Sequence, residues 1–276
     1  MSAEWQARLN QNPAMKLGII AGGGSLPSQL VDHCQKHNIE YVVVGLEGFA
    51  EIESDFYSRI GLANKIFLFL DIKKVTDVVL IGSVERPTIQ NLWPDWETFI
   101  FFLKAWLKSF GDSRLLDAAR LEIEKRGFTV RGVHEFLPEL LMPEGAITKI
   151  MPAPKFDDEI ELGFIAAKKH GEADKGQSVI ILNGNVIARE GKSGTSAMIR
   201  EHGRKGAILV KACKPQQDRN LDLPTIGPET AQLCANRKMR GIIAEAGATL
   251  LVDRAKTAQI ADQHQMFIMG IKNEPI

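Results

Sequence analysis

Cationic and acidic residues gather in one stretch of the sequence, KACKPQQDRNLDLPTIGPET. It places Lys211, Lys214 and Arg219 within a few residues of Asp218 and Asp222. Phosphoryl transfer uses this mixture, because cations neutralise phosphate oxygens while carboxylates hold a divalent ion or orient a water molecule. An ordinary solvated loop with scattered ion pairs would have the same composition, so the residues alone leave both interpretations open.

A glycine-rich turn near the start of the sequence is a second candidate. An apolar run enters three glycines, and a helical pattern opens at Ser25, Leu26 and Pro27. Glycines let the backbone approach a ligand, and a helix start attracts an anion, so the turn suits a phosphate as well as a plain tight turn. The nicotinamide fingerprint G-x-G-x-x-G is matched only in part, since Pro27 occupies its third glycine position; Glu47 would be its acidic residue. The glycines are Gly22, Gly23 and Gly24.

Further candidates lie at strand ends and helix starts. Gly82 and Ser83 end an expected strand, and ligands of doubly wound sheets bind outside the carboxyl ends of strands. Thr195 follows Gly194 where a strand gives way to a helix, so it either caps the helix or contacts a phosphate. Asp112 has the same two alternatives, capping a helix or reaching a substrate.

Composition restricts the class of protein. The 276 residues carry 34 Lys+Arg and 34 Asp+Glu, a net charge of zero, so we expect no nucleic-acid partner. Three widely spaced cysteines without a C-x-x-C indicate a reduced intracellular protein without a zinc cluster. The sequence contains neither a secretory signal nor a membrane-spanning apolar run, which predicts a cytoplasmic protein.

The periodicity of apolar residues predicts an α/β fold. The first four strands are expected at Lys16–Ala21, Tyr41–Leu46, Lys65–Leu70 and Asp77–Gly82. Their alternation with helical segments favours a parallel sheet covered on both faces, as in a Rossmann-like domain. A helical block from about Trp96 to Arg126 and a strand at Phe128–Phe136 are expected to follow.

The two closely spaced prolines of MPAPKFDDE disfavour helix and mark the expected domain boundary near residue 150. The chain then divides into an N-terminal extension (1–14), a Rossmann-like domain (15–150) and a smaller C-terminal α/β domain (151–276). In the second domain, Asn183-Gly184 predicts a β-hairpin. Its further strands are expected at AILVKA, GIIA, TLLVD and FIMGI.

Several of these segments resemble one family in the same order along the chain. The motifs are KLGIIAGGGSLP, GSVERP, RGFTVRGVHEF, AREGKSGTSAMIR, KACKPQQDRNLDLPTIGPET and GIIAEAGATLLVDR. They are similar to motifs of the UDP-2,3-diacylglucosamine pyrophosphatases of lipid A biosynthesis in many α-proteobacteria. The similarity runs from about Lys16 to Ile271, so it is far more specific than the glycine turn alone.

The resemblance implies a hydrolase that splits the diphosphate of UDP-2,3-diacylglucosamine into UMP and 2,3-diacylglucosamine 1-phosphate. It implies attack of water on phosphorus with Mg²⁺, or Mn²⁺ or Co²⁺, as cofactor. It also implies two α/β domains with the substrate cleft between them and a transient contact with the inner-membrane surface, and it leaves a homodimer open. The essential aspartate of the family motif D-L-P-T-[IV]-G corresponds to Asp222, whereas two family carboxylates are replaced by Ser113 and Ser196.

With the resemblance, the candidate residues receive roles. We expect Asp222 to bind the metal ion or to orient the attacking water, and Lys211 and Lys214 to offset the phosphate charge. The substrate-binding residues are expected to be Gly22, Gly23, Gly24, Ser25, Leu26, Gly82, Ser83, Asp112, Gly194, Thr195 and Thr225.

Two other functions stay open at this point. One is a nicotinamide-dependent oxidoreductase that uses Gly22, Gly24 and Glu47. The other is a catalytically weakened homologue that binds a sugar nucleotide or a lipid, suggested by the two serine replacements. An aromatic-rich block that includes Trp96 and Phe102 suits either an acyl-chain pocket or ordinary core packing.

Overall fold

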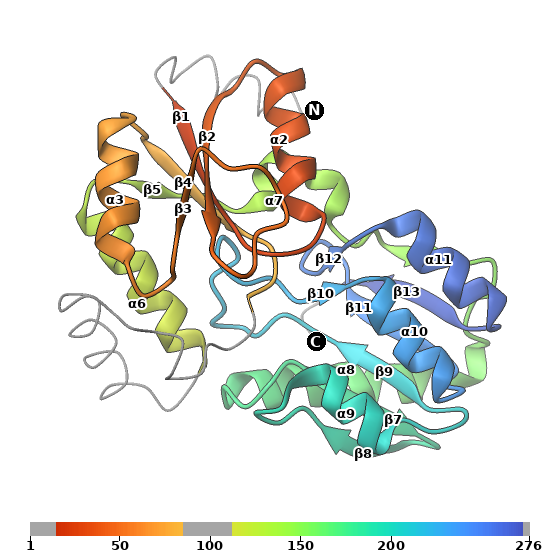
Figure 1. Ribbon diagram of the computed structural model, residues 1–276. Coiled ribbons are helices and arrows are strands. Elements are labelled where there is room, and N and C mark those ends of the chain that lie inside the picture. The colour runs from red at the N-terminus through yellow and green to blue at the C-terminus, as the bar shows by residue number, and fades with distance from the viewer. Residues whose placement is uncertain (1–14, 85–111, 273–276) are drawn as a thin grey trace. The chain divides into compact units, whose positions relative to one another are not determined.

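The computed structural model describes residues 15–84 and 112–272, without the side chains of residues 112–118 (Figure 1). The chain divides into two compact units, Met1–Pro138 and Glu139–Ile276. Both are α/β, as expected, but the second is as long as the first, whereas a smaller domain was expected. The expected N-terminal extension and the aromatic block with Trp96 and Phe102 lie outside the described residues. None of the described helices is long and apolar enough to cross a membrane.

The first unit is a wholly parallel sheet with the strand order β3-β2-β1-β4-β5. Figure 1 shows α2 and α7 on one side of this sheet and α3 and α6 on the other. The order is that of a Rossmann-type half-sheet, so the expected fold class is confirmed. The strands are β1 (Lys16–Ala21), β2 (Glu40–Leu46), β3 (Phe56–Ser58), β4 (Asp77–Ile81) and β5 (Thr129–Val130). The helices are α2 (Leu26–Lys36), α3 (Ala63–Ile72), α6 (Asp112–Lys125) and α7 (Val133–Phe136).

The expected strand at Lys65–Leu70 is wrong, because this segment forms most of helix α3. A short apolar run cannot be distinguished from a buried helix by periodicity alone. In the helix, Ile66, Phe67 and Leu70 are buried while Leu68 is 61% exposed, which is the one-sided burial of a helix face. The expected strand at Phe128–Phe136 is likewise shorter, since β5 ends at Val130 and α7 follows.

Glycine backbone holds the ends of β1 and β4 together. The Gly22 N–H donates to the Ile81 carbonyl (2.8 Å), and Gly23 and Ser83 exchange backbone hydrogen bonds of 2.8 and 2.9 Å. A Cβ on Gly22 would stand 2.5 Å from the Ser83 oxygen, and one on Gly82 would stand 2.7 Å from the Gly23 oxygen. The close approach of the two strand ends therefore requires glycine at positions 22 and 82.

The second unit is a mixed sheet with the strand order β6-β13-β11-β9-β7-β8, in which β9, β11 and β13 are parallel. Helix α8 packs on one face, whereas α9, α10 and α11 pack on the other. Its strands are β6 (Gly145–Ala146), β7 (Ser178–Leu182), β8 (Asn185–Arg189), β9 (Ile208–Lys211), β11 (Gly241–Glu245) and β13 (Phe267–Ile271), with a separate pair β10 (Thr225–Ile226) and β12 (Leu250–Leu251). Its helices are α8 (Asp157–Glu172), α9 (Gly194–His202), α10 (Pro228–Asn236) and α11 (Arg254–Gln263), and short 3₁₀ helices lie at Pro138–Leu140 and Pro154–Phe156.

Two local features of the second unit bear on the sequence predictions. The hairpin at Asn183-Gly184 joins β7 to β8, and both residues have positive φ (50° and 70°), as a tight hairpin turn requires. The short strand β6 pairs with β13, so residues 145 and 146 already belong to the second sheet. For this reason the division of the chain falls between Pro138 and Glu139, before the expected boundary near residue 150.

We predict that Gly22→Ala destabilises the protein by about 1–3 kcal/mol, because the added Cβ meets backbone that cannot move without separating β1 from β4. Equilibrium unfolding in urea measures this loss. Gly191→Ala is the matched control, since a Cβ at Gly191 meets no atom within 4 Å. Equal stabilities of the two variants would contradict a packing role for Gly22.

Candidate active site

The direction of the strands in the second unit brings several charged residues to one edge of its sheet. Strands β9 and β11 are parallel neighbours, and β8 runs in the same direction because β7 is antiparallel to both β8 and β9. Lys211 ends β9, Glu245 ends β11 and Glu190 follows β8. Carboxyl ends of strands that run in one direction share one edge, which is where open α/β sheets place their ligands.

Lys211 is buried, with only 7% of its surface exposed, and its ammonium contacts neutral oxygens. The Lys211 Nζ donates to Thr195 Oγ1 (3.3 Å) and to the backbone oxygen of Thr225 (3.1 Å). Within residues 15–84 and 112–272, no carboxylate is close enough to form an ion pair with it. A buried cation without a paired anion is costly, so the site favours the arrival of an anion.

The hydroxyl of Thr195 has a fixed direction. It donates to Glu190 Oε1 (2.8 Å), and it lies 3.1 Å from Ser178 Oγ. A hydroxyl has one proton, so Thr195 accepts from both Ser178 and Lys211. The second carboxylate oxygen of Glu190 accepts from the Gln177 N–H (2.9 Å). This network joins the start of α9 to the ends of β7, β8 and β9 and fixes the position of the Lys211 ammonium.

Burial is the main electrostatic influence on Lys211. It lowers the pKa of the ammonium below the ordinary value of 10.5, and the negative charges of Glu190 and then Asp222 oppose this shift. Asp222 therefore acts on Lys211 through space, although the two form no ion pair. Lys211, predicted to neutralise charge, and Asp222, predicted to be catalytic, are therefore close enough for their charges to interact, and their roles stay predictions.

Asp222 is half-buried and is held by one side chain. Its Oδ2 accepts a hydrogen bond of 2.7 Å from Gln217 Nε2, and its backbone N–H donates to the Asp218 oxygen (3.1 Å). Its Oδ1 accepts no hydrogen bond from the described residues. That oxygen is available for a water molecule or for a metal ion.

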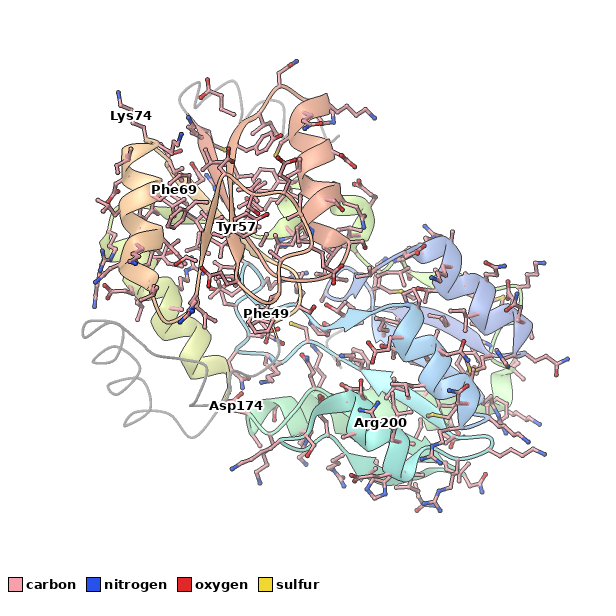
Figure 2. The ribbon with its side chains drawn as sticks, in the orientation of Figure 1. Phe49, Tyr57, Phe69, Lys74, Asp174 and Arg200 are labelled. Atoms are coloured by element: carbon pink, nitrogen blue, oxygen red, sulfur yellow. The ribbon has the colours of Figure 1, made fainter. Side chains whose placement is uncertain are left out.

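Lys214, expected to offset phosphate charge, has a carboxylate partner. Its Nζ lies 2.9 Å from Asp174 Oδ1, just beyond the end of α8 (Asp174 is labelled in Figure 2). Arg219 donates to the backbone oxygen of Gly247. Among the described residues, neither Lys211 nor Arg219 has a carboxylate partner, but Lys211 is buried whereas Arg219 is exposed, so Lys211 is the better candidate for phosphate contact.

A buried ion pair supports the chain that follows Lys211. Lys168 Nζ lies 2.7 Å from Glu245 Oε2 and donates to the Cys213 oxygen (2.9 Å), while Glu245 Oε2 accepts from the Cys213 N–H (2.8 Å). Both backbone groups of Cys213 are therefore fixed by side chains. Burial raises the pKa of the Cys213 thiol to about 11, so this residue is a protonated structural thiol at neutral pH.

The candidates of the first unit lie at its glycine turn. The N–H groups of Gly22 and Gly23 are used in pairing with β4, so they are not available to a ligand. Gly24 and Ser25 are exposed, and the Ser25 hydroxyl does not cap α2, which leaves the helix start at Leu26 open for an anion. Glu47, the acidic residue of the nicotinamide alternative, instead pairs with Arg59 (3.2 Å).

The other predicted residues lie at the starts of helices α6 and α9. Asp112 is the first residue of α6, and its side chain lies outside the described part of the chain, as does that of Ser113. Gly194 begins α9 with φ +80°, so Thr195 lies inside the helix and does not cap it. Ser196, which replaces a family carboxylate, is half-buried in the first turn of α9.

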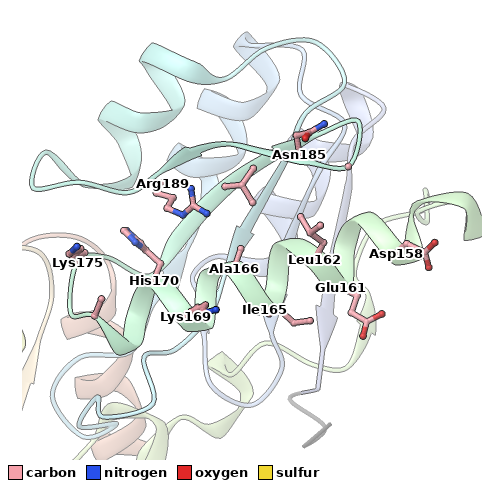
Figure 3. A pocket seen from close by; sticks show the side chains of 13 residues that line it. Asp158, Glu161, Leu162, Ile165, Ala166, Lys169, His170, Lys175, Asn185 and Arg189 are labelled. Atoms are coloured by element: carbon pink, nitrogen blue, oxygen red, sulfur yellow. The ribbon is translucent and has the colours of Figure 1, made fainter.

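A separate open groove of about 980 Å³ lies between α8 and the β7–β8 hairpin (Figure 3). Leu162 and Ile165 of α8 line it, and Arg189 and Lys169 lie toward one end. None of the residues that line it was a candidate from the sequence. None of them belongs to the hydrogen-bond network around Lys211 either, so the groove is a separate feature.

Sequence reasoning missed Glu190, Ser178 and Gln217. Glu190 directly follows a strand, which is a position where ligand-binding residues gather, so a signal existed. Ser178 lies directly opposite Lys211 in the β7–β9 register, and only the strand pairing reveals that. Gln217 lies within the charged stretch but carries no charge, so it stood out less than its neighbours.

A divalent ion fits this site only as a partner of the substrate. Among residues 15–84 and 112–272, no group of three or more His, Cys, Asp or Glu side chains converges as a metal cluster. Mg²⁺ is commonly held by one or two carboxylates together with substrate phosphates and water. The free Oδ1 of Asp222 meets that minimal requirement.

The fold and this network define a two-unit α/β protein with a buried lysine at one edge of its second sheet. Comparison with known families identifies it further. The LpxI N-terminal domain family matches residues 16–140, and the LpxI C-terminal domain family matches residues 143–269. A curated relative, the UDP-2,3-diacylglucosamine pyrophosphatase LpxI of Caulobacter vibrioides, is 35% identical over 274 residues. The match covers 93% of this chain and 97% of the relative. The chain belongs to the LpxI family, which confirms the resemblance seen in the sequence motifs.

We predict that the stability of the wild type rises relative to Lys211→Met as pH increases toward 10.5. The folded lysine has the lower pKa, so between that pKa and 10.5 the unfolded chain binds more protons, and rising pH favours folding. The slope is at most about 1.4 kcal/mol per pH unit. Urea unfolding of both proteins at several pH values measures it, and a difference that does not change with pH would contradict the burial of a strained ammonium.

Proposed function

We propose that this protein hydrolyses the diphosphate bond of UDP-2,3-diacylglucosamine, releasing UMP and 2,3-diacylglucosamine 1-phosphate. Family membership supports the substrate, since the curated relative bears the name of that pyrophosphatase. The observation that carries the chemistry is the buried Lys211, held by Thr195 and Thr225 with no carboxylate of the described residues paired to it. A phosphate oxygen is the ligand that would match this charge.

The substrate diphosphate meets two kinds of group at the proposed site, a buried cation and the start of a helix. Lys211 offsets the negative charge that develops on phosphate oxygens during the reaction. The first turn of α9 begins at Gly194 without a side-chain cap, so its N–H groups and positive dipole end serve the same anion. Thr195 connects the two groups, because it lies in the first turn of α9 and its hydroxyl accepts a hydrogen bond from the Lys211 ammonium.

Asp222 is the proposed catalytic carboxylate. Its Oδ1 orients a water molecule toward phosphorus, and it is also the group that would hold a metal ion at the site. The water oxygen forms the new bond to phosphorus, the bridging P–O bond breaks, and the bridging oxygen leaves with the departing phosphate. The proton of the water passes to the carboxylate or to solvent.

Mg²⁺ is the proposed cofactor. It would be held by Asp222 together with the substrate phosphates, and it would supply additional positive charge to the diphosphate. The residues of the site keep their own roles: Lys211 binds the anion, the Thr195 hydroxyl holds Lys211, and Asp222 orients the nucleophile.

The first unit is proposed to bind another part of the same substrate. Exposed Gly24 and Ser25 precede the uncapped start of α2, where backbone N–H groups face an anion or a polar sugar. Because the diacylated substrate is a membrane lipid, we propose that the protein is cytoplasmic and meets it at the inner-membrane surface.

We predict that Asp222→Asn lowers kcat for UMP release by about 10²–10³-fold or more, because the neutral amide does not accept the water proton and holds a cation far less strongly than a carboxylate does. Release of UMP from UDP-2,3-diacylglucosamine is measured by chromatography. Asp218→Asn is the matched control, since its amide oxygen still accepts the Asn220 N–H (3.0 Å in the wild type). Wild-type turnover in Asp222→Asn would refute the role, and a wild type without turnover would favour a weakened, binding homologue.

We predict that EDTA abolishes UMP release and that added Mg²⁺ restores it. In calorimetric titration, the protein alone binds Mg²⁺ only weakly, because the described residues supply one available carboxylate and no cluster. A non-hydrolysable diphosphate analogue strengthens that binding. Full activity in EDTA, or a tight Mg²⁺ site in the unliganded protein, would contradict the proposed arrangement.

A further inference from the structure

Gln217 contacts the proposed catalytic carboxylate directly. Its side chain is 8% exposed, and its Nε2 donates to Asp222 Oδ2 at 2.7 Å, a short hydrogen bond of the charge-assisted kind. The other end of the amide is also used, because Gln217 Oε1 accepts the Lys214 N–H at 3.0 Å. Since a backbone N–H requires an acceptor, the oxygen must face Lys214 and the NH₂ group must face Asp222.

The support behind Gln217 is rigid. Its Oε1 also lies 3.5 Å from Cys213 Sγ, and its backbone N–H donates to the Lys214 oxygen (3.0 Å). Cys213 in turn is fixed through both backbone groups by the Lys168–Glu245 ion pair. A buried amide held at both ends transmits the position of the β9 end to the carboxylate.

We propose that Gln217 is the positioning residue of this site: it holds Oδ2 of Asp222 so that Oδ1 faces the reacting phosphate. This inference rests on the proposed function of Asp222. The side chain itself does not touch substrate, and its effect passes through the carboxylate. An alternative role, closing the loop between β9 and β10, would need only the Gln217 oxygen.

Two variants separate these roles. Gln217→Met removes both hydrogen bonds at similar side-chain length, whereas Gln217→Glu keeps an oxygen for the Lys214 N–H and removes the donor to Asp222. We expect both to lower kcat by about 10²-fold, as a misplaced catalytic group does, with KM changed less than about threefold. Gln216→Glu, at an exposed neighbour, adds the same charge and loses only the hydrogen bond from Gln216 Nε2 to the Gly171 oxygen (2.8 Å), so it should keep wild-type kcat.

The measurements are steady-state UMP release and thermal unfolding of all four proteins. Lowered kcat in both Gln217 variants, with unchanged KM and with Gln217→Glu still folded, supports the positioning role. Wild-type kcat in Gln217→Glu overturns it and leaves loop closure, and an equal loss in Gln216→Glu overturns it in favour of a general charge effect. A wild type that releases no UMP overturns the proposed function itself, so the two failures are distinguishable.

Discussion

The burial of the Lys211 ammonium is the constraint around which the second unit is arranged. The side chain is 7% exposed, and its positive charge is met by the neutral oxygens of Thr195 and Thr225. Such a charge is tolerated only where hydrogen bonds surround it and a counter-ion can arrive. The end of β9, the start of α9 and strand β10 must all be in place for these contacts. Binding and folding therefore depend on the same short stretch of sheet edge.

Lysines of the second unit differ in what they do because their partners differ. Lys168 pairs with Glu245 and Lys214 with Asp174, and each of these pairs fixes a segment of chain. Breaking a buried pair leaves one charge uncompensated, so such lysines belong to the structure. Lys211 is held by the neutral oxygens of Thr195 and Thr225, and it has no carboxylate partner among the described residues. In the sequence all three residues are simply lysines. Only their contacts in the structure distinguish the two that form ion pairs from Lys211.

The residues of the glycine turn in the first unit also differ in what they contact. Gly22 and Gly82 allow the ends of β1 and β4 to come closer than any Cβ would permit, and the N–H groups of Gly22 and Gly23 are used in that pairing. Only the next residues, from Gly24, remain for a ligand at the start of α2. Strand contact thus explains Gly22 and Gly82 of the motif, whereas ligand approach from Gly24 onward stays a proposal.

By itself, the sequence determined the family, the parallel first sheet and the hairpin at Asn183-Gly184, because ordered motifs and apolar periodicity are local signals. It misassigned Lys65–Leu70, since a short apolar run fits a strand and a buried helix equally well. Only the tertiary structure decided that Lys211 lies opposite Ser178 and beside Thr195, and that Gln217 holds Asp222. Those contacts arise where strands and helices that are distant in sequence pack together, and local sequence patterns do not predict the geometry of that packing.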